Sequence, residues 1–384
     1  MKVTSLKEMM AEQAKAAVRI SEAHHSSWNG KLGVAAPDRK VRGAVTWDNT
    51  IEYNAARVTE PLQDMFDNAR VYNQDPKTLQ SYREAVKTVL HENTHVLAAE
   101  GTQHSDAKDA FQTPSVKGLE EGVTELYSYN NLDRYIDDLG LEEIAPGISS
   151  ADANRSYKQY VPAAESFTGG IARASGVERD EVVRRLAVVN AEQKFRVAAE
   201  TLYDNSDLPG LIPQQEREAA LQRIETSMKP PFEALPDLDK SDDQSLRRES
   251  AKAGGRAVDA GLAEVRALRG QWSAPQQGQR VELDATRAPQ QSTRQTQQTT
   301  PQGPQNAQQA QEPQRGRQPA GVGAQAAANG VQSPQSGDLQ HAMRAGLSGT
   351  AQMSSARPLA AGEQGSRRGG VQTGQQHQGP EREG

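Results

Sequence analysis

The sequence predicts a mainly α-helical protein of the α+β class, with one small strand unit and a long disordered tail. Apolar residues recur every three or four positions through most of residues 4–269, which is typical of amphipathic helices. One short segment instead alternates apolar and polar residues around a turn signal. The last third is rich in Gln, Pro, Gly and Ala and has few residues that could form a core.

The helices are predicted from the spacing of apolar residues and from capping signals. The first lies within residues 4–26 and ends at the stretch "NGKLGVAAPDRK". Another opens at Asp75-Pro76, a cap residue before a proline at the first helical position, and Gly101 supplies its stop. The other predicted helices are 61–72, 119–140, 154–174 and 178–203, with weaker patterns at 214–228 and 244–269.

The strand unit is predicted in residues 42–58, "RGAVTWDNTIEYNAARV". Apolar residues alternate with polar ones on both sides of the turn signal Asp48-Asn49. This pattern predicts a short hairpin or strand pair, the only convincing strand signal in the chain.

The chain is expected to divide into four parts. Residues 1–35 form an N-terminal helix and linker, 36–230 form a compact domain, and 231–270 form a charged, partly helical linker. Residues 271–384 form the disordered tail, because they include one Trp and no Ile, Phe or Tyr. Burial of so little apolar surface cannot offset the loss of roughly 1 to 2 kcal/mol of backbone entropy per ordered residue.

Composition excludes several classes of function. The chain has no cysteine, which rules out disulfides, zinc ribbons and cysteine nucleophiles. Its net charge of -6 disfavours broad nucleic-acid binding, so no nucleic-acid partner is expected. No signal peptide and no membrane span of about 20 apolar residues is recognisable. The default expectation is a cytoplasmic protein, with export by a non-standard route left open.

The segment "TVLHENTHVLAAEG", residues 88–101, places two histidines four positions apart in a predicted helix. Side chains at this spacing lie on one helical face, about 5 to 6 Å apart at Cβ, so His91 and His95 can bind one ion. Glu92 is turned about 100° from His91 and can reach a water on that ion without being a ligand. In this HExxH arrangement zinc lowers the pKa of the water and the Glu takes its proton.

A catalytic zinc site needs a third protein ligand and an open position. Glu121 and Glu125, four apart in "GLEEGVTELYS", are the better candidates, and His104 in the intervening polar loop is a weaker one. A metzincin ligand is excluded because Ala98 and Gly101 occupy the positions where that class carries Gly and His. The neighbouring Glu120 is expected on an exposed acidic helix face.

"HENTH" followed by "LEEGVTEL" resembles the gluzincin type of zinc metallopeptidase, and the similarity covers roughly residues 42–135. It implies a zincin-like metallopeptidase domain in which His91, His95 and Glu121 bind Zn²⁺. Glu92 would be the general base, and Glu125 would hydrogen-bond a ligating histidine. Glu121 lies 26 positions after His95, which exceeds the usual separation, with the extra length in the polar loop.

The resemblance also implies a peptide or protein substrate, paired along the edge of the strand unit. Tyr157 or Tyr160 is a candidate donor to the developing oxyanion, with Tyr160 preferred. The expected function is zinc-dependent hydrolysis of a peptide bond by a water that Glu92 activates. Two alternatives stay open: a non-catalytic interaction protein on a zincin scaffold, and an effector or toxin peptidase delivered by another machine.

Overall fold

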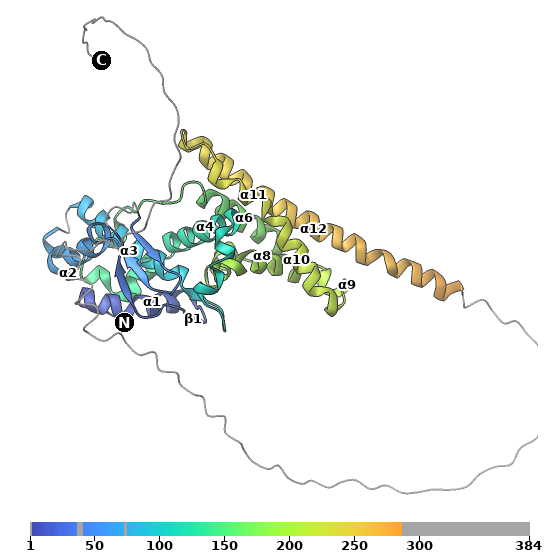
Figure 1. Cartoon of the computed structure of the whole chain (residues 1–384), viewed down its shortest axis with the longest axis horizontal. Helices are drawn as coiled ribbons and strands as arrows, with labels where there is room; N and C mark the ends of the chain where they lie inside the picture. The colour runs from blue at the N-terminus through green and yellow to red at the C-terminus, as the bar shows by residue number, and fades with distance from the viewer. Residues whose placement is uncertain (1, 37–40, 73–74, 286–384) are drawn as a thin grey trace, which may run out of the picture.

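The computed structural model describes residues 2–36, 41–72 and 75–285, and the side chains of these residues as far as Ser273, except that of Tyr72. The described chain is mainly helical, as predicted (Figure 1). The expected disordered tail lies outside the described residues from position 286 onward. Its first part, residues 271–285, instead continues the last helix.

The N-terminal half is built on α1 (Leu6–Ser21), α2 (Glu60–Tyr72) and α3 (Pro76–His95). Ser5 caps α1 by accepting a hydrogen bond from the Glu8 amide. The predicted apolar face of α1 is buried against α3 and α5 (Leu132–Leu139). The N-terminal helix therefore belongs to the core of the protein, which differs from the separate 1–35 segment expected.

The predicted hairpin is present as β3 (Gly43–Val45) and β4 (Ile51–Tyr53), which pair antiparallel with Val45 opposite Ile51. Trp47 lies in the connecting turn. The sequence missed β2 (Leu32–Val34), which pairs parallel with β4 and gives the strand order β2-β4-β3. Unlike β3 and β4, which flank the Asp48-Asn49 turn signal, β2 lies in the glycine- and proline-containing stretch that predicts only the end of the first helix.

Helix α3 begins as predicted, because Asp75 caps it and Pro76 occupies its first position. It ends at His95, earlier than the expected stop at Gly101. The next residues form β5 (Leu97–Ala98), which pairs with β1 (His25–Ser26). The predicted helix 119–140 is two helices, α4 (Pro114–Asn130) and α5, with a break at Asn131 and a left-handed cap at Gly140.

The C-terminal half contains helices that pack around a second core. Helix α12 (Asp243–Ala285) lies along α6 (Val161–Ser175), and its Ala257, Val258 and Leu268 are buried. Residues 231–270 are thus part of the helical body and not a linker. The remaining helices are α7 (Arg179–Ala187), α8 (Lys194–Asp204), α9 (Leu208–Leu211), α10 (Arg217–Met228) and α11 (Pro230–Glu233).

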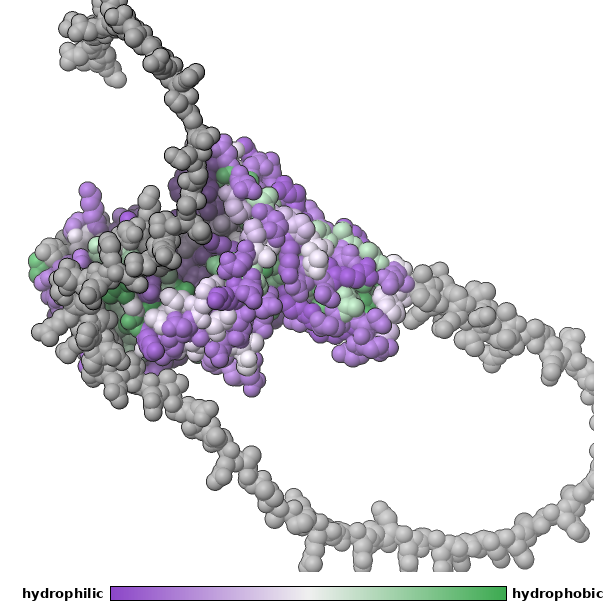
Figure 2. Space-filling view, viewed as in Figure 1, coloured by the Kyte–Doolittle hydropathy of each residue, from purple (hydrophilic) through white to green (hydrophobic). Residues whose placement is uncertain are grey.

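Two hydrophobic cores meet at the contact between α3 and α4. Leu79, Val86 and Val89 of α3 belong to the N-terminal core, whereas Leu119 and Val123 of α4 belong to the C-terminal core. On the face shown in Figure 2, the C-terminal helices present a mainly hydrophilic surface. None of the described helices is both long and apolar enough to cross a bilayer. The polar residues at the α3–α4 contact form the candidate site.

Candidate metal centre

Three potential ligands converge between α3 and α4. His91 and His95 occupy the last two turns of α3, and their Nε2 atoms are 3.2 Å apart. Glu121 extends from α4, with its Oε2 atom 3.7 Å from His91 Nε2 and 3.6 Å from His95 Nε2. Within the described part of the chain, these are the three residues whose ligand atoms lie close enough to hold one ion.

The three ligand atoms fit a small divalent cation. Their separations define a triangle whose corners lie about 2.0 Å from a common centre, the length of a zinc bond to nitrogen or oxygen. Among the described residues, Glu121 Oε2 is buried without a hydrogen-bond partner. A buried carboxylate oxygen without a partner is costly unless a cation neutralises it. Two imidazoles and one carboxylate are also a donor set found in catalytic zinc sites.

The electrostatics of the cluster favour positive charge at the imidazoles. Burial alone lowers the pKa of His91, but contacts with Glu121 and Glu125 raise it to about 9. Burial also lowers the pKa of His95, and Glu120 and Glu121 raise it well above its ordinary value. In turn, burial raises the pKa of Glu121, but the two histidines hold it far below its usual range. The carboxylates thus stabilise either protons or a metal ion at this point.

Glu92 lies beneath the edge strand β3. It is buried, and burial raises the pKa of its carboxyl above the usual value. A Cβ atom added at Gly43 would lie 2.7 Å from both Cγ and Oε1 of Glu92. The absence of a side chain at position 43 therefore allows the strand to pass directly over this carboxylate.

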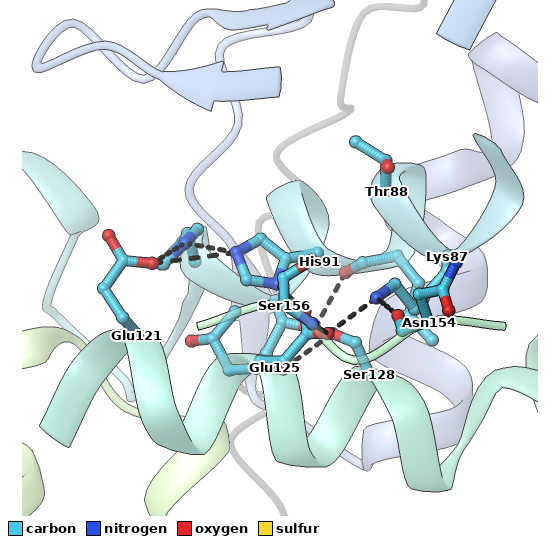
Figure 3. Close-up of polar contacts among 12 residues, drawn as sticks. Lys87, Thr88, His91, Glu121, Glu125, Ser128, Asn154 and Ser156 are labelled. Carbon is cyan, nitrogen blue, oxygen red and sulfur yellow. Dashed lines mark hydrogen bonds and ion pairs between the residues drawn. The ribbon is translucent and has the colours of Figure 1, made fainter. Parts of the chain in front are cut away.

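Glu125 contacts His91, as the resemblance implied. Its Oε2 atom is 3.1 Å from His91 Nδ1. Its Oε1 atom accepts hydrogen bonds from Lys87 Nζ at 2.6 Å and from the Ser156 amide at 2.7 Å. Figure 3 shows Glu121 and Glu125 pointing from α4 toward His91. Lys87 was not anticipated, although its position four residues before His91 places it on the same helical face.

Glu120 is buried, and the expectation of an exposed acidic face was wrong. Its Oε1 atom is 2.7 Å from His95 Nδ1, and its Oε2 atom is 3.1 Å from Lys194 Nζ. Both Glu120 and Lys194 have at most 1% of their surface exposed. The sequence missed this because α4 is covered by neighbours on several sides, and Lys194 is distant in the chain.

The structure brings Tyr157 to the cluster, whereas Tyr160 belongs to the C-terminal core. The Tyr157 ring stacks on His91 with centroids 5.3 Å apart and an interplanar angle of 2°. Burial, and then the nearby Glu121 and Glu92, raise the pKa of the Tyr157 phenol. The Tyr160 backbone packs on α4, where its carbonyl oxygen would be 2.8 Å from a Cβ at Gly122.

His104 lies beside the cluster and not within it. Its Nδ1 atom is 3.1 Å from the His95 carbonyl oxygen, and its ring stacks on Trp47 at a centroid distance of 4.8 Å. Burial and the neighbouring His95 lower the pKa of His104 to about 4. These contacts place His104 in the wall next to His95, while Glu121 supplies the third potential ligand atom.

Comparison with protein-family profiles, with curated proteins and with solved structures gave no match for this chain. The convergence of the side chains at the α3–α4 contact therefore carries the functional interpretation.

Proposed function

We propose that the protein is a zinc-dependent metallopeptidase of the gluzincin type. The observation that supports this best is the convergence of His91 and His95 of α3 with Glu121 of α4. Glu92 lies beside these ligands, on the adjacent face of α3. A metal-binding scaffold without catalytic activity has no need of a buried carboxylate in that position. A zinc ion held by the three ligands would polarise the scissile carbonyl and lower the pKa of a water.

Glu92 is the general base in this proposal. Its carboxylate takes a proton from the attacking water and passes it to the leaving amine. Burial raises the pKa of Glu92, which makes it a stronger base than an exposed glutamate. Tyr157 is our candidate donor to the developing oxyanion, because its ring stacks on His91 and a phenol is protonated at neutral pH.

Strand β3 is a suitable edge for an extended peptide. The Asn54 amide bonds to the Arg42 carbonyl and the Thr46 amide to the Thr50 carbonyl, so even-numbered residues face β4. By the alternation of an antiparallel pair, the backbone groups of Gly43 and Val45 face away from β4. Within the described chain this side of β3 has no paired strand. A peptide that paired there would pass next to Glu92, because Gly43 contacts it.

The test compares the wild type with Glu92→Gln and His95→Ala. Elemental analysis should find about one zinc per chain in the wild type and in Glu92→Gln, but none in His95→Ala. Cleavage of a mixed fluorogenic peptide library should occur with the wild type alone. Turnover by Glu92→Gln at the wild-type rate would refute the mechanism. A wild type that binds zinc and cleaves no peptide would instead support a non-catalytic interaction protein.

A further inference from the structure

Lys194 is the most completely buried cation near the metal centre. It begins α8, and its side chain is 0% exposed. Its Nζ atom donates to the Leu186 carbonyl at 2.6 Å and to the Val189 carbonyl at 3.0 Å, and lies 3.1 Å from Glu120 Oε2. Lys194 is thus held by two hydrogen bonds to backbone carbonyls and by one buried ion pair with Glu120.

The surroundings of Lys194 fix the place of its charge. Leu186 lies in the last turn of α7, where the helix dipole and the free carbonyl groups favour a cation. The Lys194 ammonium group is fixed in place, because two of its hydrogens are already bound to backbone oxygens. Glu120 is therefore drawn to a fixed position, and Thr124 Oγ1 also donates to its Oε1 at 3.2 Å.

The position of Glu120 determines the orientation of His95. With Glu120 Oε1 2.7 Å from Nδ1, the hydrogen of the neutral imidazole is placed on Nδ1. Nε2 then carries the lone pair and faces His91 and Glu121, where the ion would bind. A carboxylate behind a ligating imidazole both orients the ring and increases its basicity.

We propose that Lys194 is a positioning residue for the metal centre, which acts through Glu120 to hold His95 in its metal-binding orientation. This inference rests on the proposed metal site but not on peptide hydrolysis. It links the last turn of α7 and the start of α8 to a ligand on α3. The series of contacts from Lys194 through Glu120 to His95 has a counterpart in the contacts from Lys87 through Glu125 to His91. Each potential histidine ligand thus has its own carboxylate and its own buried lysine.

The experiment measures zinc affinity by competition with a chromophoric chelator in Lys194→Met, Glu120→Gln and the double variant. Loss of such an outer partner typically costs about 10- to 100-fold in metal affinity, and we expect a loss of that size in each single variant. Because Lys194 acts through Glu120, adding Lys194→Met to Glu120→Gln should weaken binding by less than about twofold more. Lys229→Met, which removes an ion pair with Glu225 on α10, is the matched control and should bind zinc normally.

The absorption spectrum of the Co²⁺-substituted protein gives a second measurement. A displaced His95 should change the ligand-field bands in Lys194→Met, whereas Lys229→Met should keep the wild-type spectrum. Lys194→Gln keeps a hydrogen-bond donor and serves if Lys194→Met does not fold, with an intermediate loss of affinity expected. Unchanged affinity in the lysine variants, or equal losses from Lys194→Met in both backgrounds, would overturn the proposal.

The outcome is separable from that for the proposed function. A wild type that binds zinc without cleaving peptides, together with weaker binding in Lys194→Met, leaves this inference intact and removes the peptidase. Peptide cleavage by the wild type, with full zinc affinity in Lys194→Met, overturns this inference and leaves the peptidase intact.

Discussion

Zinc uptake should displace one proton that His91 and His95 share in the metal-free protein. Their Nε2 atoms are 3.2 Å apart, a distance that admits one hydrogen between the two nitrogens and not two. Both Nδ1 atoms face carboxylates, Glu125 for His91 and Glu120 for His95, and a nearby carboxylate favours a hydrogen on each of these nitrogens. A metal ion binds only the deprotonated nitrogen, so the shared proton must leave.

The size of the effect follows from the carboxylates around the pair. Burial lowers the pKa of His91, but Glu121 and Glu125 raise it to about 9. Because the folded pKa of both histidines is raised, the extra proton is present at neutral pH and is lost only as the pH rises to about 9 or beyond. The apparent affinity for zinc should therefore fall about tenfold for each pH unit below 9, which weakens the binding free energy by about 1.4 kcal/mol per unit. With an ordinary histidine pKa, the decline would begin only near pH 6.5.

Calorimetric titration with zinc at pH 7.5, in two buffers of different ionisation enthalpy, counts the released protons. We expect about one per chain in the wild type. Glu125→Gln, which removes one of the charges that raise the pKa of His91, should release less at the same pH. Zero protons from the wild type at pH 7.5, or affinity that is constant between pH 7 and 9, would rule out a proton shared by the two histidines.

Three further predictions concern the roles of single residues. Gly43→Ala should displace Glu92 while zinc content stays normal, and steady-state kinetics should show kcat lower by about 10²-fold, the cost of a displacement of about 1 Å. Tyr157→Phe should lower kcat by about 10²- to 10³-fold with zinc content unchanged, and an equal kcat would exclude the phenol as the oxyanion donor. Glu121→Ala should lose stoichiometric zinc by elemental analysis whereas His104→Ala keeps it, and the reverse result would make His104 the third ligand.

The parts of the site that were predictable depend on short-range geometry. The spacing of His91 and His95 places them on one helical face whatever the tertiary structure, and a hairpin follows from the Asp48-Asn49 turn. The end of α3 was predicted too late, because the residues after His95 pair with β1, a segment about 70 positions earlier in the sequence. Pairing over such a distance leaves no local signal.

Burial of charged residues was the least predictable feature. Glu120 and Lys194 each look like surface residues of an amphipathic helix, and the contact between them is visible only in the folded chain. The position of Tyr157, and not Tyr160, beside His91 is likewise visible only in the folded chain. The sequence places both near the start of one helix, and a left-handed backbone at Tyr157, with φ of 52°, accompanies the stacking of its ring on His91.

The position of the candidate ligands at the meeting of two cores has a mechanical consequence. His91 and His95 belong to a helix of the N-terminal core and Glu121 to a helix of the C-terminal core, so an ion bound by all three would join the two halves. At a free ion concentration 100 times Kd, binding would raise the free energy needed to separate the two halves by about 2.7 kcal/mol. The loaded protein would then unfold as one cooperative unit, whereas a chelator would let one half open before the other and expose the α3–α4 contact to proteases.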